Sequence, residues 1–258
     1  MTTETPSTVA ARYQEILRRI ADAAQRAGRE PGEITLVGAS KSQPVERLVA
    51  AVEAGLRVFG ENRVQEGEAH RAAVEAALGE ERLAELSPRL QWHLIGPLQS
   101  NKAKRAAATF EAFHALARLK IGRHLDRHLG DLLEAGELAA DDLPRPAWIE
   151  VNIGGEASKH GFSPDGLAET VRPLADLTNL RPVGIMVIPP FESEGGTEAE
   201  TRRWFRRARD LRDELAARPE WEGFPGLLSM GMSDDFEIAV EEGSTHVRVG
   251  SSLFGPRG

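Results

Sequence analysis

Short apolar segments alternate with amphipathic segments along this chain, and that alternation limits the folds open to it. The apolar segments are short enough for buried strands, and the segments between them repeat apolar residues at helical spacing. Strands are expected at residues 34–38, 57–59, 90–95, 110–114, 147–153, 183–188, 227–229 and 245–249. Helices are expected at residues 45–52, 62–78, 98–109, 116–133, 164–177, 197–217 and 233–242. This order indicates parallel strands joined by helical crossovers.

Eight such strands favour a closed (β/α)8 barrel, the TIM barrel, over an open doubly wound sheet. One barrel of about 250 residues uses nearly all of the 258 residues, so a single domain over 1–258 is expected. A helix at 8–27 precedes the first strand and is an addition to the repeating unit. Residues 134–146 are interpreted as a surface connection, where a domain boundary is the alternative.

Composition narrows the range of partners. The net charge of −8 disfavours binding to nucleic-acid phosphates, and the absence of cysteine excludes thiolate chemistry. The first ten residues have neither the basic region nor the apolar region of a secretory signal peptide. No apolar run is long enough to span a bilayer. A cytoplasmic, monomeric protein without membrane or nucleic-acid partners is expected.

Polar residues and glycines gather where the predicted strands end. In a barrel these ends open on one face, which holds the active site. Lys41 follows the first strand, where it is either a nucleophilic amine activated by desolvation or a surface lysine. Arg248, flanked by Val247 and Val249, either faces inward toward a ligand or outward toward a helix carboxylate. The residues alone leave both alternatives open.

Two loops match the usual phosphate site of this fold, which lies after strands seven and eight. Ser229-Met230-Gly231 ends the seventh strand, and Gly250-Ser251 follows the eighth. Small residues let backbone N–H groups approach a phosphate, although glycines also serve tight turns. No metal site is predicted, because His124 and His128 lie on an outer helix without a third ligand. No common hydrolase, NTPase or dinucleotide motif occurs.

The same junctions carry a family resemblance over nearly the whole chain. The segments are ITLVGASKSQP (34–44), FGENRVQE (59–66), WHLIGPLQSNKAK (92–104), VNIGGEASKHGF (151–162), LLSMGMSDDFEIAV (227–240) and STHVRVGSSLFG (244–255). They resemble the YggS/PROSC family, the pyridoxal phosphate homeostasis proteins. The resemblance implies a barrel like the N-terminal domain of alanine racemase, with pyridoxal 5′-phosphate (PLP) held as a Schiff base on Lys41.

The resemblance also implies roles for the other residues at these junctions. It places the PLP phosphate against Ser229, Met230, Gly231, Gly250 and Ser251, points Arg248 at the pyridine nitrogen, and lines the pocket with Asn62, His93 and Met186. Lys159 matches a family lysine near the pocket. Three residues depart from the common family pattern: Arg63 replaces tyrosine, Ser251 replaces threonine and Val187 replaces alanine.

Two functions are compatible with this resemblance. The first is a PLP carrier in vitamin B6 homeostasis, with apo PLP-dependent enzymes as transient partners. The second is an amino-acid racemase, in which His93 or His160 would have to serve as the second base.

The carrier is favoured because racemases of this type use a tyrosine from a further C-terminal domain, whereas this sequence ends at Gly258 and has only Tyr13. An arginine at the pyridine nitrogen also leaves the ring unprotonated, a poorer electron sink, although alanine racemases share that arginine. A barrel for another phosphorylated metabolite is a third reading that leaves Lys41 unexplained.

Overall fold

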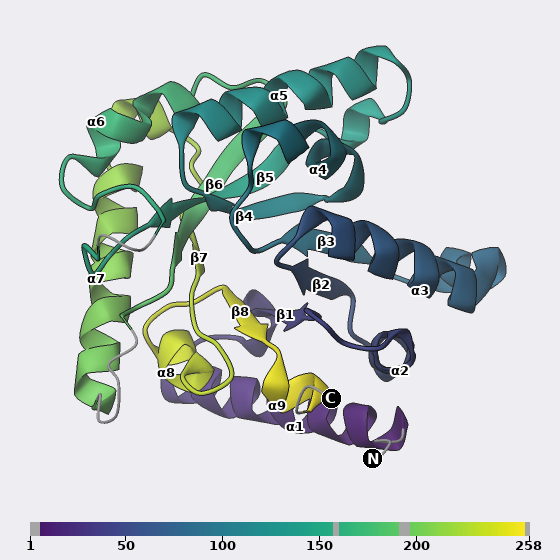
Figure 1. The fold of residues 1–258 in the computed structure, drawn as a ribbon. Helices are drawn as coiled ribbons and strands as arrows, with labels where there is room; N and C mark the ends of the chain where they lie inside the picture. Colours follow the sequence, from purple (N-terminus) through teal and green to yellow (C-terminus); the bar gives the residue numbers. More distant parts are fainter. Residues whose placement is uncertain (1–5, 157–159, 191–196, 256–258) are drawn as a thin grey trace.

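A closed barrel of eight parallel strands, in the order of the sequence, forms the centre of the molecule (Figure 1). The structure is a computed structural model that describes residues 6–156, 160–190 and 197–255. The strands are β1 Thr35–Ala39, β2 Val58–Glu61, β3 Gln91–Leu94, β4 Ala112–Leu116, β5 Arg145–Val151, β6 Leu180–Val187, β7 Leu227–Ser229 and β8 His246–Val249. The barrel closes where β1 pairs with β8, with Val37 opposite Arg248. The predicted (β/α)8 barrel is confirmed.

Helices follow the strands and cover the outside of the barrel (Figure 1). They are α1 Pro6–Arg26, α2 Val45–Ala54, α3 Val64–Glu85, α4 Ala103–Thr109, α5 Leu119–Glu134, α6 Leu167–Val171, α7 Glu198–Ala216, α8 Phe236–Glu241 and α9 Ser251–Phe254. Among the residues that the structure describes, no helix has the length and apolar character needed to cross a membrane.

The core has two layers, because parallel strands bury both of their faces. The larger layer lies between the strands and the helices; in it, Phe59 of β2 stacks on Trp92 of β3 with ring centroids 4.8 Å apart. A smaller cluster contains Trp148, Val183 and Met186. The ring of Trp148 stacks on that of His114, with centroids 4.0 Å apart, so polar groups lie beside this second layer.

Several elements differ in their bounds from the sequence prediction. The helix expected at 164–177 is the short α6, which continues as a 3₁₀ turn over Arg172–Leu174. Pro173 lies in that turn and has no N–H to continue an α-helix. The helix expected to end at 78 runs on to Glu85, across a break at Gly79 where φ is 76°. The short helix α9 was not predicted.

The additional helix α1 packs against the first and last parts of the barrel. It contacts α2, α8 and α9, and in Figure 1 it runs along the side where β8 and β1 meet. Residues 134–146 were expected to be a connection, but their last two residues already belong to β5. Arg145 is buried and donates a hydrogen bond to the carbonyl of Ala107 at 2.8 Å. The strands on either side of this segment belong to the same closed barrel.

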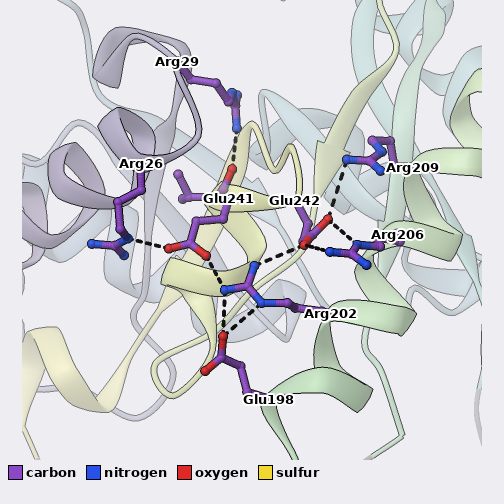
Figure 2. Close-up of polar contacts among 9 residues, drawn as sticks. Arg26, Arg29, Glu198, Arg202, Arg206, Arg209, Glu241 and Glu242 are labelled. Atoms are coloured by element: carbon purple, nitrogen blue, oxygen red, sulfur yellow. Dashed lines mark hydrogen bonds and ion pairs between the residues drawn. The ribbon is translucent and has the colours of Figure 1, made fainter.

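A network of arginines and glutamates ties α1, α7 and α8 together (Figure 2). Arg26 of α1 donates to Glu241 at 2.6 Å, and Arg202 of α7 pairs with both Glu241 and Glu242. Arg206 donates to the nearly buried Glu242 carboxylate at 3.0 Å. Burial opposes ionisation of Glu242, but the hydrogen bonds from Arg206 and Arg202 outweigh it and hold the pKa of Glu242 below its ordinary value.

Replacing Glu242 with glutamine is expected to lower the free energy of unfolding by about 1.5–3 kcal/mol at neutral pH, the range for hydrogen bonds to a charged group. A fully buried pair would cost more, about 3–5 kcal/mol, but the Arg206 side chain is 58% exposed and regains water. Because the folded pKa is lowered, the contribution of Glu242 is present above its unfolded pKa and disappears as pH falls through the folded pKa.

The measurement is urea unfolding of both proteins from neutral to acid pH. The matched control is Glu198→Gln in the same network, whose side chain is 64% exposed and which should cost only about 0.2–1 kcal/mol. A difference between the unmodified protein and Glu242→Gln that stayed constant down to the acid end would contradict the ion-pair explanation.

Candidate functional site

A cavity of about 770 Å³ opens at the carboxyl ends of the strands. Its lining residues come from the segments that follow β1 to β6. They include Lys41, Asn62, Arg63, Lys102, Arg118, Glu150 and His160. Glu150 is the single carboxylate among them, and burial raises the pKa of this carboxyl group. The cavity is therefore positively charged in a protein of net charge −8.

Lys41 lies at the edge of this cavity, two residues beyond the end of β1. In the described part of the chain, no hydrogen bond or ion pair engages its ammonium group. The loop around it is held on both sides. Ser40 donates from Oγ to Glu61 Oε1 at 2.6 Å, and the Ser42 amide donates to a carboxylate oxygen of Glu66. The second bond supports a left-handed backbone at Ser42, where φ is 58°, a conformation costly for residues other than glycine.

Glu61, which is fully buried, also binds His70 of α3. Glu61 Oε1 lies 2.6 Å from His70 Nδ1, and this hydrogen bond raises the pKa of the imidazole above its ordinary value. Glu61, Glu66 and His70 place possible metal-ligand atoms within 4.8 Å of one another. The hydrogen bonds to Ser40, Ser42 and His70 engage Oε1 of Glu61 and Oε1 of Glu66, so the cluster fixes the Lys41 loop. Glu61 Oε2 is buried without a hydrogen-bond partner among the described residues.

The loops after β7 and β8 meet beside the end of β1. Gly231 has φ of 91°, and a Cβ there would lie 2.5 Å from the Cβ of Ala239, so this position requires glycine. Gly250 approaches the end of β1, because a Cβ on it would lie 3.2 Å from the Ala39 carbonyl oxygen. The two loops therefore stand next to the Lys41 segment.

Ser233 connects these two loops. Its Oγ receives the amide N–H groups of Gly250 at 3.4 Å and Ser252 at 3.5 Å, and the Ser251 hydroxyl lies 3.2 Å away. Amide hydrogen bonds are usually about 2.9–3.0 Å long. These two amides are thus weakly satisfied donors beside two hydroxyls, a donor set that suits a phosphate.

Arg248 faces the interior of the barrel. Of the two orientations that the sequence left open, inward and outward toward a helix carboxylate, the structure has the inward one. Its guanidinium donates to the carbonyl of Ser229 at 2.7 Å, to Ser229 Oγ at 2.6 Å and to the carbonyl of Val187 at 3.1 Å. Burial lowers the pKa of Arg248 to about 10, so it remains a cation at neutral pH. Among the described residues, no carboxylate lies within ion-pair distance of it.

Behind Arg248, two buried histidines continue the polar interior. Ser229 Oγ lies 2.7 Å from His114 Nδ1, and His114 Nε2 lies 3.0 Å from His93 Nδ1. Burial lowers the pKa of His93 to about 3 and that of His114 well below its ordinary value, so both rings are neutral. The Ser229 hydroxyl is thus engaged inside the barrel, whereas the sequence predicted that it would donate to a phosphate.

The structure brings only some of the predicted site residues to the cavity. Lys41 and Asn62 line it, whereas the remaining predicted residues within the described chain are absent from the lining: His93, Met186, Ser229, Met230, Gly231, Arg248, Gly250 and Ser251. Lys159 lies outside the described residues. Arg63, which departs from the family pattern, is an exposed residue of the lining.

Sequence reasoning missed Ser233 and His114. Ser233 was expected only as the first residue of a helix, and His114 only as the last residue of a strand. A signal was present for His114, because it stands between Phe113 and Ala115 in an apolar strand, and a polar residue there faces the interior.

This closed barrel, with a lysine after its first strand and glycine loops after its last two, is of the alanine racemase N-terminal type. The family model of the alanine racemase N-terminal domain matches residues 12–258. The chain belongs to the pyridoxal phosphate homeostasis proteins, the YggS/PROSC family, as its motifs predicted.

Several relatives carry the name pyridoxal phosphate homeostasis protein, among them one from Pseudomonas aeruginosa and one from Aquifex aeolicus. The one from Pseudomonas aeruginosa is 39% identical over 252 residues, which cover 97% of this chain and 96% of the relative. The one from Aquifex aeolicus is 38% identical over 246 residues, covering 95% and 97% of the two chains.

Solved structures agree with this assignment. PipY of Synechococcus elongatus, described with PLP bound, is 34% identical with a TM-score of 0.71, covering 92% of this chain and 100% of PipY. An alanine racemase from Corynebacterium glutamicum is 14% identical with a TM-score of 0.62, covering 98% of this chain and 62% of the racemase, and shows the fold alone.

Proposed function

We propose that this protein binds PLP as a Schiff base on Lys41 and acts in the cell as a monomeric carrier in vitamin B6 homeostasis. The observation that carries the proposal is an uncommitted lysine at the edge of a cavity, next to two loops that present weakly satisfied N–H donors. The names of the relatives and the PLP bound in PipY support the choice of ligand. PLP supplies an aldehyde that reacts with amines.

Lys41 performs the covalent part of this binding. Its amine would condense with the aldehyde of PLP, with release of one molecule of water. The tethers from Ser40 to Glu61 and from Ser42 to Glu66 hold the lysine in place. Asn62 would contact the ligand from the cavity side.

The phosphate would lie against the loops after β7 and β8. Gly231 and Gly250 allow the backbone to come close, and the amides of Gly250 and Ser252 with the Ser251 and Ser233 hydroxyls are the donors. Arg248 would donate to the pyridine nitrogen. His93, Met186, Ser229 and Met230 would support these contacts from behind.

We favour a carrier over a racemase because of what surrounds Lys41. The single tyrosine of the sequence, Tyr13, lies beside Gly55 at the end of α2 and is absent from the cavity lining. His93 has both ring nitrogens in hydrogen bonds and a pKa of about 3, so it is unsuited to accept a proton. Release of PLP to apo PLP-dependent enzymes would complete the carrier function.

Titration of the ligand-free protein with PLP and with pyridoxal, which lacks the phosphate, tests this arrangement. The unmodified protein should bind PLP much more tightly than pyridoxal. Ser251→Ala removes one hydroxyl donor to a charged group, worth about 1.5–3 kcal/mol, so PLP affinity should fall about 10-fold to 100-fold. Pyridoxal affinity should change little. Absorbance of the bound ligand is the measurement, and equal weakening of both ligands would assign Ser251 a structural role only.

A further inference from the structure

The hydrogen bonds inside the barrel form one continuous chain. It runs from Arg248 through Ser229 and His114 to His93, whose Nε2 lies 3.1 Å from Oε1 of Gln91 at the start of β3. The chain thus connects a residue near the mouth of the barrel with the opposite end of the strands. Ser229 and His114 are fully buried and His93 is nearly so.

The direction of every bond in this chain follows from the chemistry of its two ends. At one end, Arg248 has only donors, so Ser229 Oγ accepts from it. The buried Ser229 hydroxyl must then donate a hydrogen bond, and the one acceptor within reach among the described residues is His114 Nδ1. A neutral imidazole that accepts at Nδ1 carries its proton on Nε2, so His114 donates to His93 Nδ1.

The other end agrees with this assignment, given that the Gln91 amide presents its oxygen to His93. Gln91 Oε1 is an acceptor, so His93 must donate to it from Nε2. Neutral His93 then accepts at Nδ1, in agreement with donation from His114. Reversing the chain would leave the Ser229 hydroxyl proton without an acceptor inside the barrel, which costs the desolvation of a buried polar group.

We propose that His114 and His93 position the guanidinium of Arg248 by way of the Ser229 hydroxyl. This inference rests on the proposed function, in which Arg248 meets the pyridine nitrogen of PLP. His114 takes the Ser229 proton, which turns the oxygen lone pairs toward Arg248. Together with the carbonyls of Ser229 and Val187, this oxygen sets where the guanidinium lies. Ser229 is in this view a positioning residue and donates nothing to the phosphate.

Nitrogen-15 NMR of the histidine rings tests the direction of the hydrogen bonds from Ser229 to His93 in the absence of any ligand. Both His93 and His114 are expected to be neutral at pH 7, with the proton on Nε2 and a bare Nδ1. A proton on Nδ1 of His114 in the ligand-free protein would overturn the proposal, whether or not the protein binds PLP.

Affinity measurements test the positioning itself. His114→Phe removes the acceptor and should weaken PLP binding about 10-fold, the effect of one hydrogen bond to a charged group. His114→Asn offers a carbonyl oxygen near the position of Nδ1 and should restore most of the affinity. The double variant His114→Phe/Ser229→Ala should bind no more weakly than Ser229→Ala alone, because His114 acts through Ser229.

His246→Phe is the matched control. The ring of His246 packs on Trp148 and His114, but its Nδ1 bonds to Thr245 Oγ1 and stands outside the chain. The His246→Phe variant should leave PLP affinity unchanged. Thermal unfolding of every variant checks that each one folds. Additive losses in the double variant, or equal losses in His114→Asn and His114→Phe, would show that His114 only fills space. Absence of PLP binding by the unmodified protein would instead reject the proposed function.

Discussion

Replacing Lys41 with alanine is expected to abolish covalent attachment of PLP. The unmodified protein, loaded with PLP and reduced with borohydride, should retain a pyridoxyl group on the peptide that contains Lys41. In Lys41→Ala no nucleophile remains at the end of β1, so the reduced protein should carry no such group. Loose binding through the phosphate loops should persist, because the Gly250 and Ser252 amides are unaffected.

Peptide mass mapping after reduction is the measurement. Lys120→Ala on α5 is the control, since Lys120 is an exposed lysine that is absent from the cavity lining. A stoichiometric adduct that survives in Lys41→Ala and maps to Lys102 or Lys159 would overturn the assignment of the reactive lysine.

The PLP-loaded protein is expected to interconvert amino-acid enantiomers far more slowly than enzymes usually work. Racemisation needs a proton-transfer group on each face of the substrate carbanion, and each such group contributes about 10²–10⁴-fold. Lys41 supplies one face, whereas Tyr13 and His93 are unsuited to the other. Relative to a median turnover of about 10 s⁻¹, loss of one group leaves about 10⁻¹ to 10⁻³ s⁻¹.

Chiral chromatography of a panel of amino acids, started from each enantiomer, measures this rate. Besides the lysines Lys41 and Lys102, the carboxylate of Glu150 and the imidazole of His160 line the cavity and can accept a proton. Turnover of 1–10³ s⁻¹, the common enzyme range, that disappears in Lys41→Ala would reject the carrier function. Loss of that turnover in Glu150→Gln or His160→Ala would then identify the second base.

The barrel and the Lys41 junction were predictable because they depend on local patterns. Eight short apolar strands alternate with helices, and the residues that follow parallel strands share one face whatever the details of packing. The same rule led from the sequence to the loops containing Gly231 and Gly250, whereas Asn62 was expected in the pocket from the family resemblance. Helix lengths were less accessible, since a single residue such as Pro173 ends a helix that apolar spacing would continue.

The interior of the barrel could not be derived from the sequence in the same way. His93 and His114 lie on different strands and Ser229 is far from both in sequence, so their contact depends on the register of the closed barrel. The sequence also could not show that the Ser229 hydroxyl is used inside the barrel. A serine at a strand end is suited to a phosphate or to a buried network, and the three-dimensional arrangement of acceptors decides which.

The series of hydrogen bonds from Arg248 through Ser229 and His114 to His93 affects the electrostatic field at the mouth of the barrel. The Ser229 O–H and the Nε2–H groups of His114 and His93 all point away from the mouth, so their bond dipoles align with the negative ends toward the guanidinium. Aligned hydrogen bonds polarise one another by about 10–30% per bond. The barrel thus stabilises a buried cation by oriented dipoles in addition to the carboxylates of Asp235 and Glu150, which lie beyond ion-pair distance. The positive field of Arg248 therefore remains directed at whatever ligand ring lies above it.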